Sequence, residues 1–324
     1  MRGAPRVPRP RLALSSRVVI TGATGFAGSH LAAHCAAAGD DVTALSRAAG
    51  VDLLDAAAVE RAIAAAAPAV VYHLAALAHV GRSWQAPSDT LTQNQAMTLN
   101  VLEAVRRTAP EAAVVAVSSG ELYGPPAALP VGEDAPLRPQ NPYAVSKAST
   151  DLLAGFYADA HGLRVVRPRA FNHSGPGQPP LFALASFARQ VAAGLEAGDD
   201  PIRVVSGNPD ARRDYTDVRD VVRAYRLLAG AGATGIVNVC SGRSRSAREL
   251  IEGLAAVAGI PVDHVVDHQL VRAHEVMDVR GSSDRLRGLT GWEPEIALER
   301  TLGDTVAWWR EEIRAGRADR RTHE

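Results

Sequence analysis

One short segment near the start of the chain constrains its fold more than any other. Val18-Val19-Ile20 is an apolar run, and it leads directly into residues 21–28, TGATGFAG, which open an alanine-rich stretch. Glycines at this spacing permit a tight turn between a strand and a helix, and they let backbone N–H groups approach a pyrophosphate. Glycine-rich turns are common by themselves, so the flanking strand and helix carry the argument. The segment predicts a phosphate-binding turn whose contacts are Gly22, Thr24, Gly25, Phe26, Ala27 and Gly28.

Strand-like and helix-like segments alternate through the first half of the chain. Short β-rich runs predict strands at residues 17–21, 41–45, 69–73, 112–118 and 164–167. Longer alanine-rich segments predict helices at residues 27–38, 55–67, 90–108 and 142–161. Right-handed crossovers would join such strands in parallel. We therefore predict an α/β fold with a doubly wound parallel Rossmann sheet and a ligand crevice at the carboxyl ends of its strands.

The composition of the sequence changes after Phe171. Residues 172–180 are dense in glycine and proline, whereas residues 217–228 and 236–240 return to helix and strand character. This return predicts two interleaved domains. The predicted division is a disordered tail at 1–16, a dinucleotide-binding Rossmann domain at 17–171 and about 209–239, and a smaller C-terminal substrate domain at about 172–208 and 240–315.

Lysine usage singles out one position. Of the 35 basic residues only Lys147 is a lysine, and the others are arginines. Tyr143 stands four residues earlier in a segment that Pro142 opens as a helix, so both side chains should lie on one face. A phenol with an ordinary pKa of about 10 exchanges protons near neutral pH only if a neighbouring cation favours the phenolate. We predict that Tyr143 and Lys147 form a catalytic pair in which the ammonium lowers the phenol pKa and also contacts the ribose of a nicotinamide cofactor. A chance spacing is the alternative.

A third catalytic group should be a hydroxyl at the end of a neighbouring strand, where it could hold a substrate oxygen. The apolar run of residues 114–117 is followed by Ser118 and Ser119. A strand end that faces the crevice suits this task. The pattern does not separate the two serines, and either could be an ordinary turn residue.

The end of the second predicted strand bears on cofactor choice. An acidic residue there would accept hydrogen bonds from a ribose 2′-OH, whereas a basic residue would accommodate a 2′-phosphate. Ser46 and Arg47 occupy this place. The sequence thus favours NADP(H), with NAD(H) possible, unless Arg47 is simply a solvated surface cation.

The glycine-rich turn, Ser119 and the Tyr143–Lys147 pair together resemble the extended short-chain dehydrogenase/reductase family, also called the NAD-dependent epimerase/dehydratases. The resemblance runs from Arg17 to Arg310. It implies Ser119, not Ser118, as the catalytic hydroxyl, and a homodimer through a four-helix bundle made by the helices at 90–108 and 142–161. It also implies further cofactor contacts from Asp52, Leu53, Leu74, Ala75, Ala76, Asn94 and Pro168.

Within that family, residues 171–178, 212–220 and 238–242 resemble GDP-4-keto-6-deoxy-mannose reductases most closely. The resemblance implies that the smaller domain binds a nucleotide-diphosphate sugar. By similarity, Asn172, Arg213 and Arg272 would grip its diphosphate and Glu275 would lie near the nucleotide ribose. Arginine suits this task because its planar fork pairs with two phosphate oxygens. The expected activity is reduction of the C4 ketone of an NDP-4-keto-6-deoxyhexose.

Two departures keep other functions open. Leu181 is apolar where these reductases often carry a basic residue, so the nucleotide could differ. Glu121 matches a catalytic acid of sugar dehydratases, although Gly120 replaces the Asp that glucose-type dehydratases place beside it. The alternatives are a 4,6-dehydratase or epimerase with tightly bound NAD, or a non-catalytic dinucleotide-binding sensor. A sensor would be expected to lack the Tyr143–Lys147 pair.

Composition argues against several other kinds of protein. The 35 basic and 35 acidic residues cancel, which disfavours a nucleic-acid partner. No uncharged apolar run reaches the roughly 18 residues that a membrane span requires. Cys35 and Cys240 show no metal-ligand spacing, so we expect neither a disulfide nor a metal site, and a reducing, cytoplasmic location fits.

Overall fold

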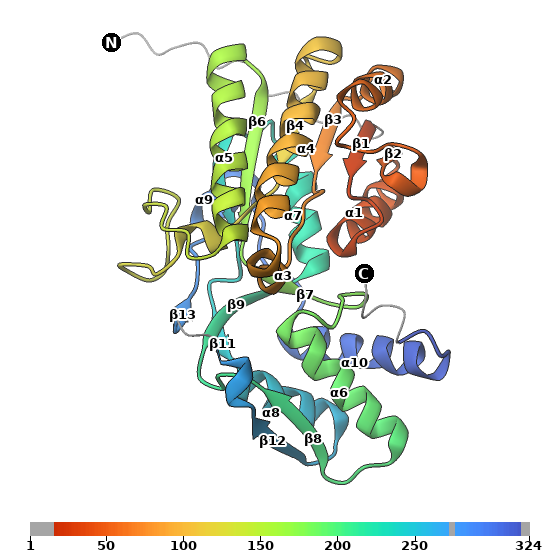
Figure 1. Ribbon diagram of the computed structural model, residues 1–324, viewed down its shortest axis with the longest axis vertical. Coiled ribbons are helices and arrows are strands. Elements are labelled where there is room, and N and C mark those ends of the chain that lie inside the picture. The colour runs from red at the N-terminus through yellow and green to blue at the C-terminus, as the bar shows by residue number, and fades with distance from the viewer. Residues whose placement is uncertain (1–15, 272–275, 319–324) are drawn as a thin grey trace.

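The computed structural model describes residues 16–271 and 276–318 of the chain (Figure 1). Most of the predicted tail at 1–16 therefore lies outside the described residues. Ser16 itself is buried, and its backbone N–H donates to Asp40 Oδ1 at 3.2 Å. The prediction of disorder was wrong for this residue, because it continues the pairing at the start of the first strand, where Asp41 N donates to Ser16 O at 2.9 Å.

A parallel sheet forms the centre of the larger lobe (Figure 1). Its strand order is β10-β6-β4-β3-β1-β2, and β5 lies beside β6. The strands are rich in β-branched residues such as Val19, Ile20 and Val71, which are fully buried between two helical layers. The strand bounds are β1 (Arg17–Thr21), β2 (Asp41–Leu45), β3 (Val70–His73), β4 (Ala113–Ala116), β5 (Ser118–Ser119), β6 (Arg164–Ala170) and β10 (Gly235–Val239).

The single strand predicted at 112–118 is divided in two. β4 ends at Ala116, and β5 then pairs Ser118 with Arg169 and Ser119 with Ala170 of β6. Val117 between them still donates its N–H to His73 O at 3.1 Å. This break displaces both serines toward β6 at the carboxyl edge of the sheet.

Helices cover both faces of this sheet, as a doubly wound fold requires. α1 and α7 enclose an apolar core on one face, and α2, α4 and α5 enclose a second core on the other. α9 packs against α7 and β10, and α3 lies beside α4 and α5. The helix bounds are α1 (Phe26–Ala37), α2 (Ala56–Ala66), α3 (Val80–Gln85), α4 (Pro87–Thr108), α5 (Pro142–His161), α7 (Val218–Gly230) and α9 (Asp284–Thr290), with short turns η1 (Arg47–Ala49) and η2 (Gly120–Tyr123).

The smaller lobe lies below the sheet in Figure 1 and contains a third apolar core. Its helices pack on one another: α6 (Ala183–Ala197), α8 (Ala247–Ala258) and α10 (Leu298–Arg314). The helices α6 and α8 also pack on a parallel pair of strands, β8 (Ile202–Ser206) and β12 (Val262–Val266). The short turn η3 (His268–Leu270) follows β12. A four-stranded sheet connects the lobes. It consists of β11 (Ser244–Ser246), β9 (Arg212–Asp217), β13 (Asp278–Val279) and β7 (Asn172–Ser174).

The chain order places one crevice at a defined position. After β1 the chain adds β2 on one side and then returns to add β3 on the other side. Helices that leave two such strands go to opposite faces, so the carboxyl ends of β1 and β3 are not covered by either. Ligand binding is expected at this point of the sheet.

Candidate active site

The turn after β1 has the shape that a dinucleotide pyrophosphate requires. Gly28 admits no side chain, because a Cβ there would lie 2.0 Å from the carbonyl oxygen of Gly22. Gly22 has φ +71°, and a Cβ on it would lie 2.9 Å from Ala75 N. α1 begins after Gly25 with no side-chain cap and no acidic residue in its first turn. Its first N–H groups therefore point outward at a positive helix end, and these residues fit the phosphates of NAD(P).

The segment after β3 is fastened to this turn. The backbone N–H groups of Leu74 and Ala75 both donate to Thr21 Oγ1 at 3.2 Å. Leu74, Ala75 and Ala76 are all half-buried. The two loops predicted to contact the cofactor thus lie side by side at the switch point of the sheet.

The end of β2 carries the two residues predicted to select the cofactor. Ser46 caps η1, accepting a hydrogen bond from Ala49 N at 3.2 Å, and Arg47 is exposed in the first position of that turn. Further along, Asp52 is exposed and accepts from Leu54 N at 3.0 Å, whereas Leu53 is buried. Arg47 is therefore accessible beside the crevice.

The side chain of Asn94 binds the backbone of the loop after β3 and does not point into the crevice. Its side chain is buried; Oδ1 accepts from Leu77 N at 2.7 Å, and Nδ2 donates to Leu77 O and to Ser146 Oγ at 3.3 and 2.9 Å. The expected direct contact with the cofactor is not what this geometry supports, because protein groups occupy both ends of the amide. Asn94 instead ties the segment after β3 to α5.

Local capping places Tyr143 and Lys147 at the carboxyl edge of the sheet. Asn141 caps α5 by accepting from Ala144 N at 2.8 Å, and Pro142 occupies the first turn. Lys147 is buried, and its Nζ donates to Val117 O at 2.5 Å. Burial lowers the pKa of the Lys147 ammonium to about 8, although the charge of Asp151 opposes this change.

The phenol of Tyr143 does not behave as predicted. Burial raises its pKa to about 12; the hydroxyl of Ser119 opposes this change, and the charge of Glu121 adds to it. The expected net lowering of the phenol pKa was wrong for this structure, because burial is the largest influence on Tyr143. The Lys147 ammonium donates to Val117 O. Tyr143 is consequently a protonated acid at neutral pH.

The structure separates the two serines that the sequence could not. Ser119 lies close enough to Tyr143 for a side-chain hydrogen bond, and its Oγ accepts from Glu121 N at 3.2 Å. Ser118 is buried and its Oγ has no hydrogen-bond partner among the described residues. Ser119 and Tyr143 therefore lie together, and Lys147 contacts the backbone two residues before Ser119, at Val117 O.

Comparison with known proteins assigns the family. A family model with the description "NAD dependent epimerase/dehydratase family" matches residues 18–240. The chain belongs to this family. The matched segment contains the glycine-rich turn, Ser119, Tyr143 and Lys147 together.

Several members of the NAD-dependent epimerase/dehydratase family match almost the whole chain. GDP-6-deoxy-D-mannose reductase from Pseudomonas aeruginosa is 38% identical over 304 residues, which cover 93% of this chain and 99% of that protein. UDP-glucose 4-epimerase from Mycolicibacterium smegmatis is 31% identical over 317 residues, covering 91% and 98%. Among solved structures, RMD from Pseudomonas aeruginosa complexed with NADPH has a TM-score of 0.85 at 38% identity, and the match covers 92% of this chain and 99% of that one.

Two of the four residues expected to bind substrate lie on neighbouring strands of the sheet that connects the lobes. Asn172 lies in β7, whose neighbour β9 carries Arg213. Arg213 Nη1 donates to Val276 O at 2.7 Å and to Arg212 O at 2.9 Å. Pro168 is buried in β6. Arg272 and Glu275, the other two predicted substrate contacts, lie outside the described residues.

The sequence did not lead us to predict a buried ion cluster on α5, the helix that carries Tyr143 and Lys147. Asp151 lies on α5 with a fully buried side chain and pairs with Arg169 and Arg167 of β6 at 2.9 and 3.1 Å. A signal was available in the sequence. Arg167 and Arg169, two of the three arginines in the otherwise apolar strand RVVRPRA, and an acid spaced four residues after Lys147 both indicate a paired charge inside the fold.

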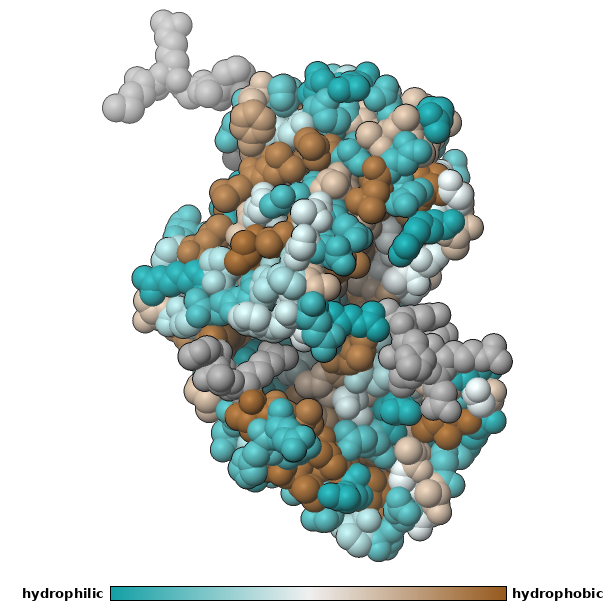
Figure 2. All heavy atoms as spheres, viewed as in Figure 1, coloured by the Kyte–Doolittle hydropathy of each residue, from teal (hydrophilic) through white to brown (hydrophobic). Residues whose placement is uncertain are grey.

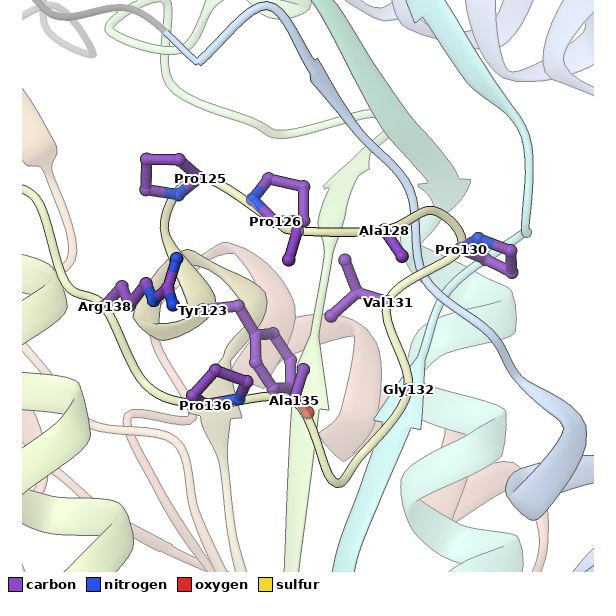
Figure 3. A pocket seen from close by; sticks show the side chains of 11 residues that line it. Tyr123, Pro125, Pro126, Ala128, Pro130, Val131, Gly132, Ala135, Pro136 and Arg138 are labelled. Carbon is purple, nitrogen blue, oxygen red and sulfur yellow. The ribbon is translucent and has the colours of Figure 1, made fainter.

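A separate pocket is lined by Tyr123 and by residues of the segment that follows it (Figure 3). It has a volume of about 240 Å³ and lies between η2 and the loop that leads to α5. Its wall is mainly proline, alanine and valine, and Arg138 is its one charged lining residue. Tyr123 lines it, but Ser119, Tyr143 and Lys147 do not.

Within residues 16–271 and 276–318, no group of three or more His, Cys, Asp or Glu side chains is arranged to hold a metal ion. No helix in that part of the chain is long and apolar enough to cross a membrane.

Proposed function

We propose that this chain is an NADPH-dependent reductase of an NDP-4-keto-6-deoxyhexose, of the GDP-4-keto-6-deoxymannose type, that reduces the C4 ketone. The observation that carries the proposal is the end-to-end similarity to GDP-6-deoxy-D-mannose reductase, 38% identity over 93% of this chain. The similarity includes the substrate lobe as well as the Rossmann sheet, so it bears on the substrate and not only on the cofactor.

The protonation state of Tyr143 supports the reductive direction. When bound, NADPH supplies a hydride to the carbonyl carbon. Tyr143 donates its proton to the carbonyl oxygen, which becomes the C4 hydroxyl, and Ser119 hydrogen-bonds that oxygen. Burial holds the pKa of Tyr143 at about 12, so the acid is loaded with a proton at neutral pH. Lys147 lies one helical turn after Tyr143 on α5, and we propose that its positive charge stabilises the phenolate left after the transfer.

The proposed cofactor is NADP(H), with NAD(H) possible. A relative of the same fold is solved in complex with NADPH. Arg47 is exposed at the end of β2, where a 2′-phosphate would be accommodated. The proposed contacts are those of the β1 turn, Ser46, Arg47, Asp52, Leu53, Leu74, Ala75, Ala76, Tyr143, Lys147 and Pro168, with Asn94 acting through Leu77.

We assign the substrate to the smaller lobe. Residues about 172–208 and 240–315 are the proposed nucleotide-sugar domain, and residues 17–171 with about 209–239 the dinucleotide domain. Asn172, Arg213, Arg272 and Glu275 are the proposed contacts to the sugar nucleotide. Arg213 fits this role because a guanidinium recognises a diphosphate through two parallel hydrogen bonds.

Dehydration or epimerisation is the second candidate function. The position of Glu121 favours it, since the charge of this carboxylate raises the pKa of Tyr143 and thus acts on the same site. A carboxylate there could remove a proton from the sugar ring in a dehydratase. UDP-glucose 4-epimerase relatives match most of the chain at lower identity than the reductase.

The proposal includes a homodimer and a cytoplasmic location. α4 and α5 pack together and present exposed apolar side chains, and Figure 2 shows apolar surface among polar atoms over these helices. The exposed residues are Leu99 on α4 and Val145, Leu152 and Phe156 on α5. Cys35 and Cys240 are free and buried, which fits a reducing compartment.

The test is NADPH oxidation by purified protein with freshly made GDP- and dTDP-4-keto-6-deoxyhexoses. We expect turnover with at least one of them, and we expect Tyr143→Phe to lower kcat by more than ~10²-fold, the usual size of an acid–base contribution, with NADPH affinity kept. If the purified protein carries tightly bound NAD and does not oxidise NADPH with either sugar, the reductase proposal is wrong and the dehydratase or epimerase function takes its place.

A further inference from the structure

Asp151, Arg167 and Arg169 form a buried ion cluster directly behind Lys147. Asp151 stands one helical turn after Lys147 on α5 and two turns after Tyr143, so all three side chains lie along one helix face. The side chain of Asp151 has 0% exposure and that of Arg169 has 3%. A buried carboxylate at this position needs partners, because an uncompensated charge inside a protein is costly.

Two guanidinium groups from β6 supply those partners. Arg169 donates from Nε to Asp151 Oδ2 at 3.1 Å and from Nη2 to Oδ1 at 2.9 Å. Arg167 lies two residues earlier on the same strand face and donates to Asp151 Oδ1 and O at 3.1 and 3.2 Å. Gly155 leaves room for it, since a Cβ there would lie 2.6 Å from Arg167 Nη1. The two-pronged Arg169 contact fixes both the position and the orientation of the carboxylate.

Arg169 also supports the other half of the proposed site. Its guanidinium lies 5.0 Å from the centroid of the Tyr123 ring, and Tyr123 donates its hydroxyl to Asn238 Oδ1 at 2.7 Å. Tyr123 ends η2, the turn that follows Ser119 and contains Glu121. One buried side chain therefore connects the turn after the proposed hydroxyl to the helix that carries the acid–base pair.

The charge balance gives Asp151 a task beyond packing. Without its carboxylate, Lys147, Arg167 and Arg169 would form a group of three neighbouring cations, of which Lys147 and Arg169 are buried. Arginine does not lose its proton in proteins, so lysine is the only one of the three that can relieve the repulsion by becoming neutral. The loss of Asp151 should therefore lower the pKa of Lys147.

Other titratable groups around Lys147 do not replace this carboxylate. Tyr143 precedes it on α5, and Glu121 of η2 acts on Tyr143. Burial, with the Lys147 charge, lowers the pKa of His73 on β3 to about 3, so that ring stays neutral at the pH of interest. On α4, Glu103 is engaged with Arg106 and with Tyr157 at the far end of α5.

We propose that Asp151, held in position by Arg169 and Arg167, is a positioning residue that acts on Lys147 by keeping its ammonium charged. Asp151 acts through Lys147 and is not itself a catalytic residue. The proposal rests on the proposed function for the task of Lys147 in turnover, but the charge state of Lys147 can be measured without any substrate.

The chain itself supplies the probe. Lys147 is the only lysine, so lysine isotopically labelled at Cε gives a single resonance in protein carrying a lysine-free tag. Its chemical shift, followed from neutral to alkaline pH, reports the pKa of this ammonium. We expect a midpoint of about 8 in the wild type and a midpoint lower by about one unit or more in Asp151→Asn, as for the loss of a neighbouring opposite charge.

Asp40→Asn is the matched control. Asp40 is also a fully buried carboxylate of the Rossmann sheet and pairs with Arg226 at 2.8 Å, near Cys35 and Tyr72 instead of Lys147. It should lose stability in the same way while the Lys147 midpoint stays at its wild-type value. An Asp151→Asn midpoint equal to that of wild type, or an equal fall in both variants, overturns the proposal.

A second substitution has the opposite expected sign and keeps the test decisive if Asp151→Asn does not fold. Arg167→Gln removes one partly exposed cation and leaves the Asp151–Arg169 pair, so the Lys147 midpoint should rise. A midpoint that falls or does not move overturns the proposal. In active protein, the pH at which kcat falls on the alkaline side should shift in each variant in the same direction as the midpoint of the Lys147 resonance. Wild type that fails to reduce any keto sugar would refute the proposed function, whereas the resonance would still decide the role of Asp151.

Discussion

At the scale of single residues, we expect the charge of Lys147 to set the pH range in which the proposed site works. Burial places the pKa of Lys147 at about 8 and that of Tyr143 at about 12. As pH rises, the ammonium therefore loses its charge well before the phenol loses its proton. The positive charge beside Tyr143 is present below about pH 8 and is lost above it, so we expect the proposed reductase rate to be highest on the acidic side of this value.

Lys147→Arg tests whether the site needs this particular cation. Arginine keeps the charge at every accessible pH, but its planar fork is larger than an ammonium and cannot make the same single contact with Val117 O. We expect kcat to fall by at least ~10²-fold, and the alkaline limit of the remaining activity to move to higher pH. A wild-type rate and pH profile in this variant would contradict the assignment and would make the lone lysine an accident of composition.

Arg47→Asp tests the choice of cofactor. The substitution removes the exposed cation at the end of β2 and adds a carboxylate, which repels a 2′-phosphate and accepts from a 2′-hydroxyl. We expect the ratio of kcat/KM for NADPH to that for NADH to fall by ~10-fold or more, in line with the loss of one hydrogen bond to a charged group. A wild-type enzyme that already prefers NADH tenfold would show that the cofactor assignment is wrong.

At the scale of elements, the strand–turn–helix unit of β1 and α1 depends on the absence of a side chain at Gly28. A Cβ on Gly28 would lie 2.0 Å from Gly22 O, within the backbone of the turn that faces the crevice. Backbone cannot swing aside as a flexible side chain can, so the turn would have to open.

We therefore expect Gly28→Ala to weaken NADPH binding by at least ~10-fold, and to lower stability by about 1–3 kcal/mol, the usual range for overpacking. Thermal melting and fluorescence titration with NADPH would measure both effects. Gly288→Ala in α9 is the control, because nothing lies within 4 Å of its Cβ position and alanine is the better helix former. Unchanged NADPH affinity in Gly28→Ala would exclude this turn as the pyrophosphate site.

At the scale of the whole molecule, α4 and α5 form an exposed helical face whose apolar residues have no cover within the described chain. Leu152 is 61% exposed and Phe156 57% exposed on α5. Large apolar side chains that gather on one surface mark sites of association. This face is the one expected to form a dimer.

A double substitution, Leu152→Glu with Phe156→Glu, should convert the proposed dimer to a monomer, because paired copies would bring four carboxylates together. Light scattering after size-exclusion chromatography gives the mass directly. Val257→Glu on α8 is the control, since Val257 is 40% exposed on the other lobe. A monomeric wild type, or a double variant that stays dimeric, would count against the dimer through these helices.

Much of the architecture was determined by local patterns in the sequence. The alternation of apolar residues with period two or 3.6 sets strands and helices within each segment, and the predicted sheet agrees with β1, β2, β3 and β6 at nearly every start. The glycine spacing acts within eight residues, and Tyr143 and Lys147 are brought together by one helical turn. These features depend only on neighbours along the chain, which is why they could be predicted.

Other features were decided by contacts between distant segments. Ser119 was distinguished from Ser118 by its side-chain hydrogen bond with Tyr143, which lies on a different element of the fold. The raised pKa of Tyr143 reflects burial by surrounding elements, and Asn94 found its partners in Leu77 and in Ser146 of another helix. The clamp on Asp151 needs a strand and a helix packed face to face. Burial and partner choice are properties of the assembled layers, and no local pattern contains them; only the tertiary structure could decide how the charges of this site are arranged.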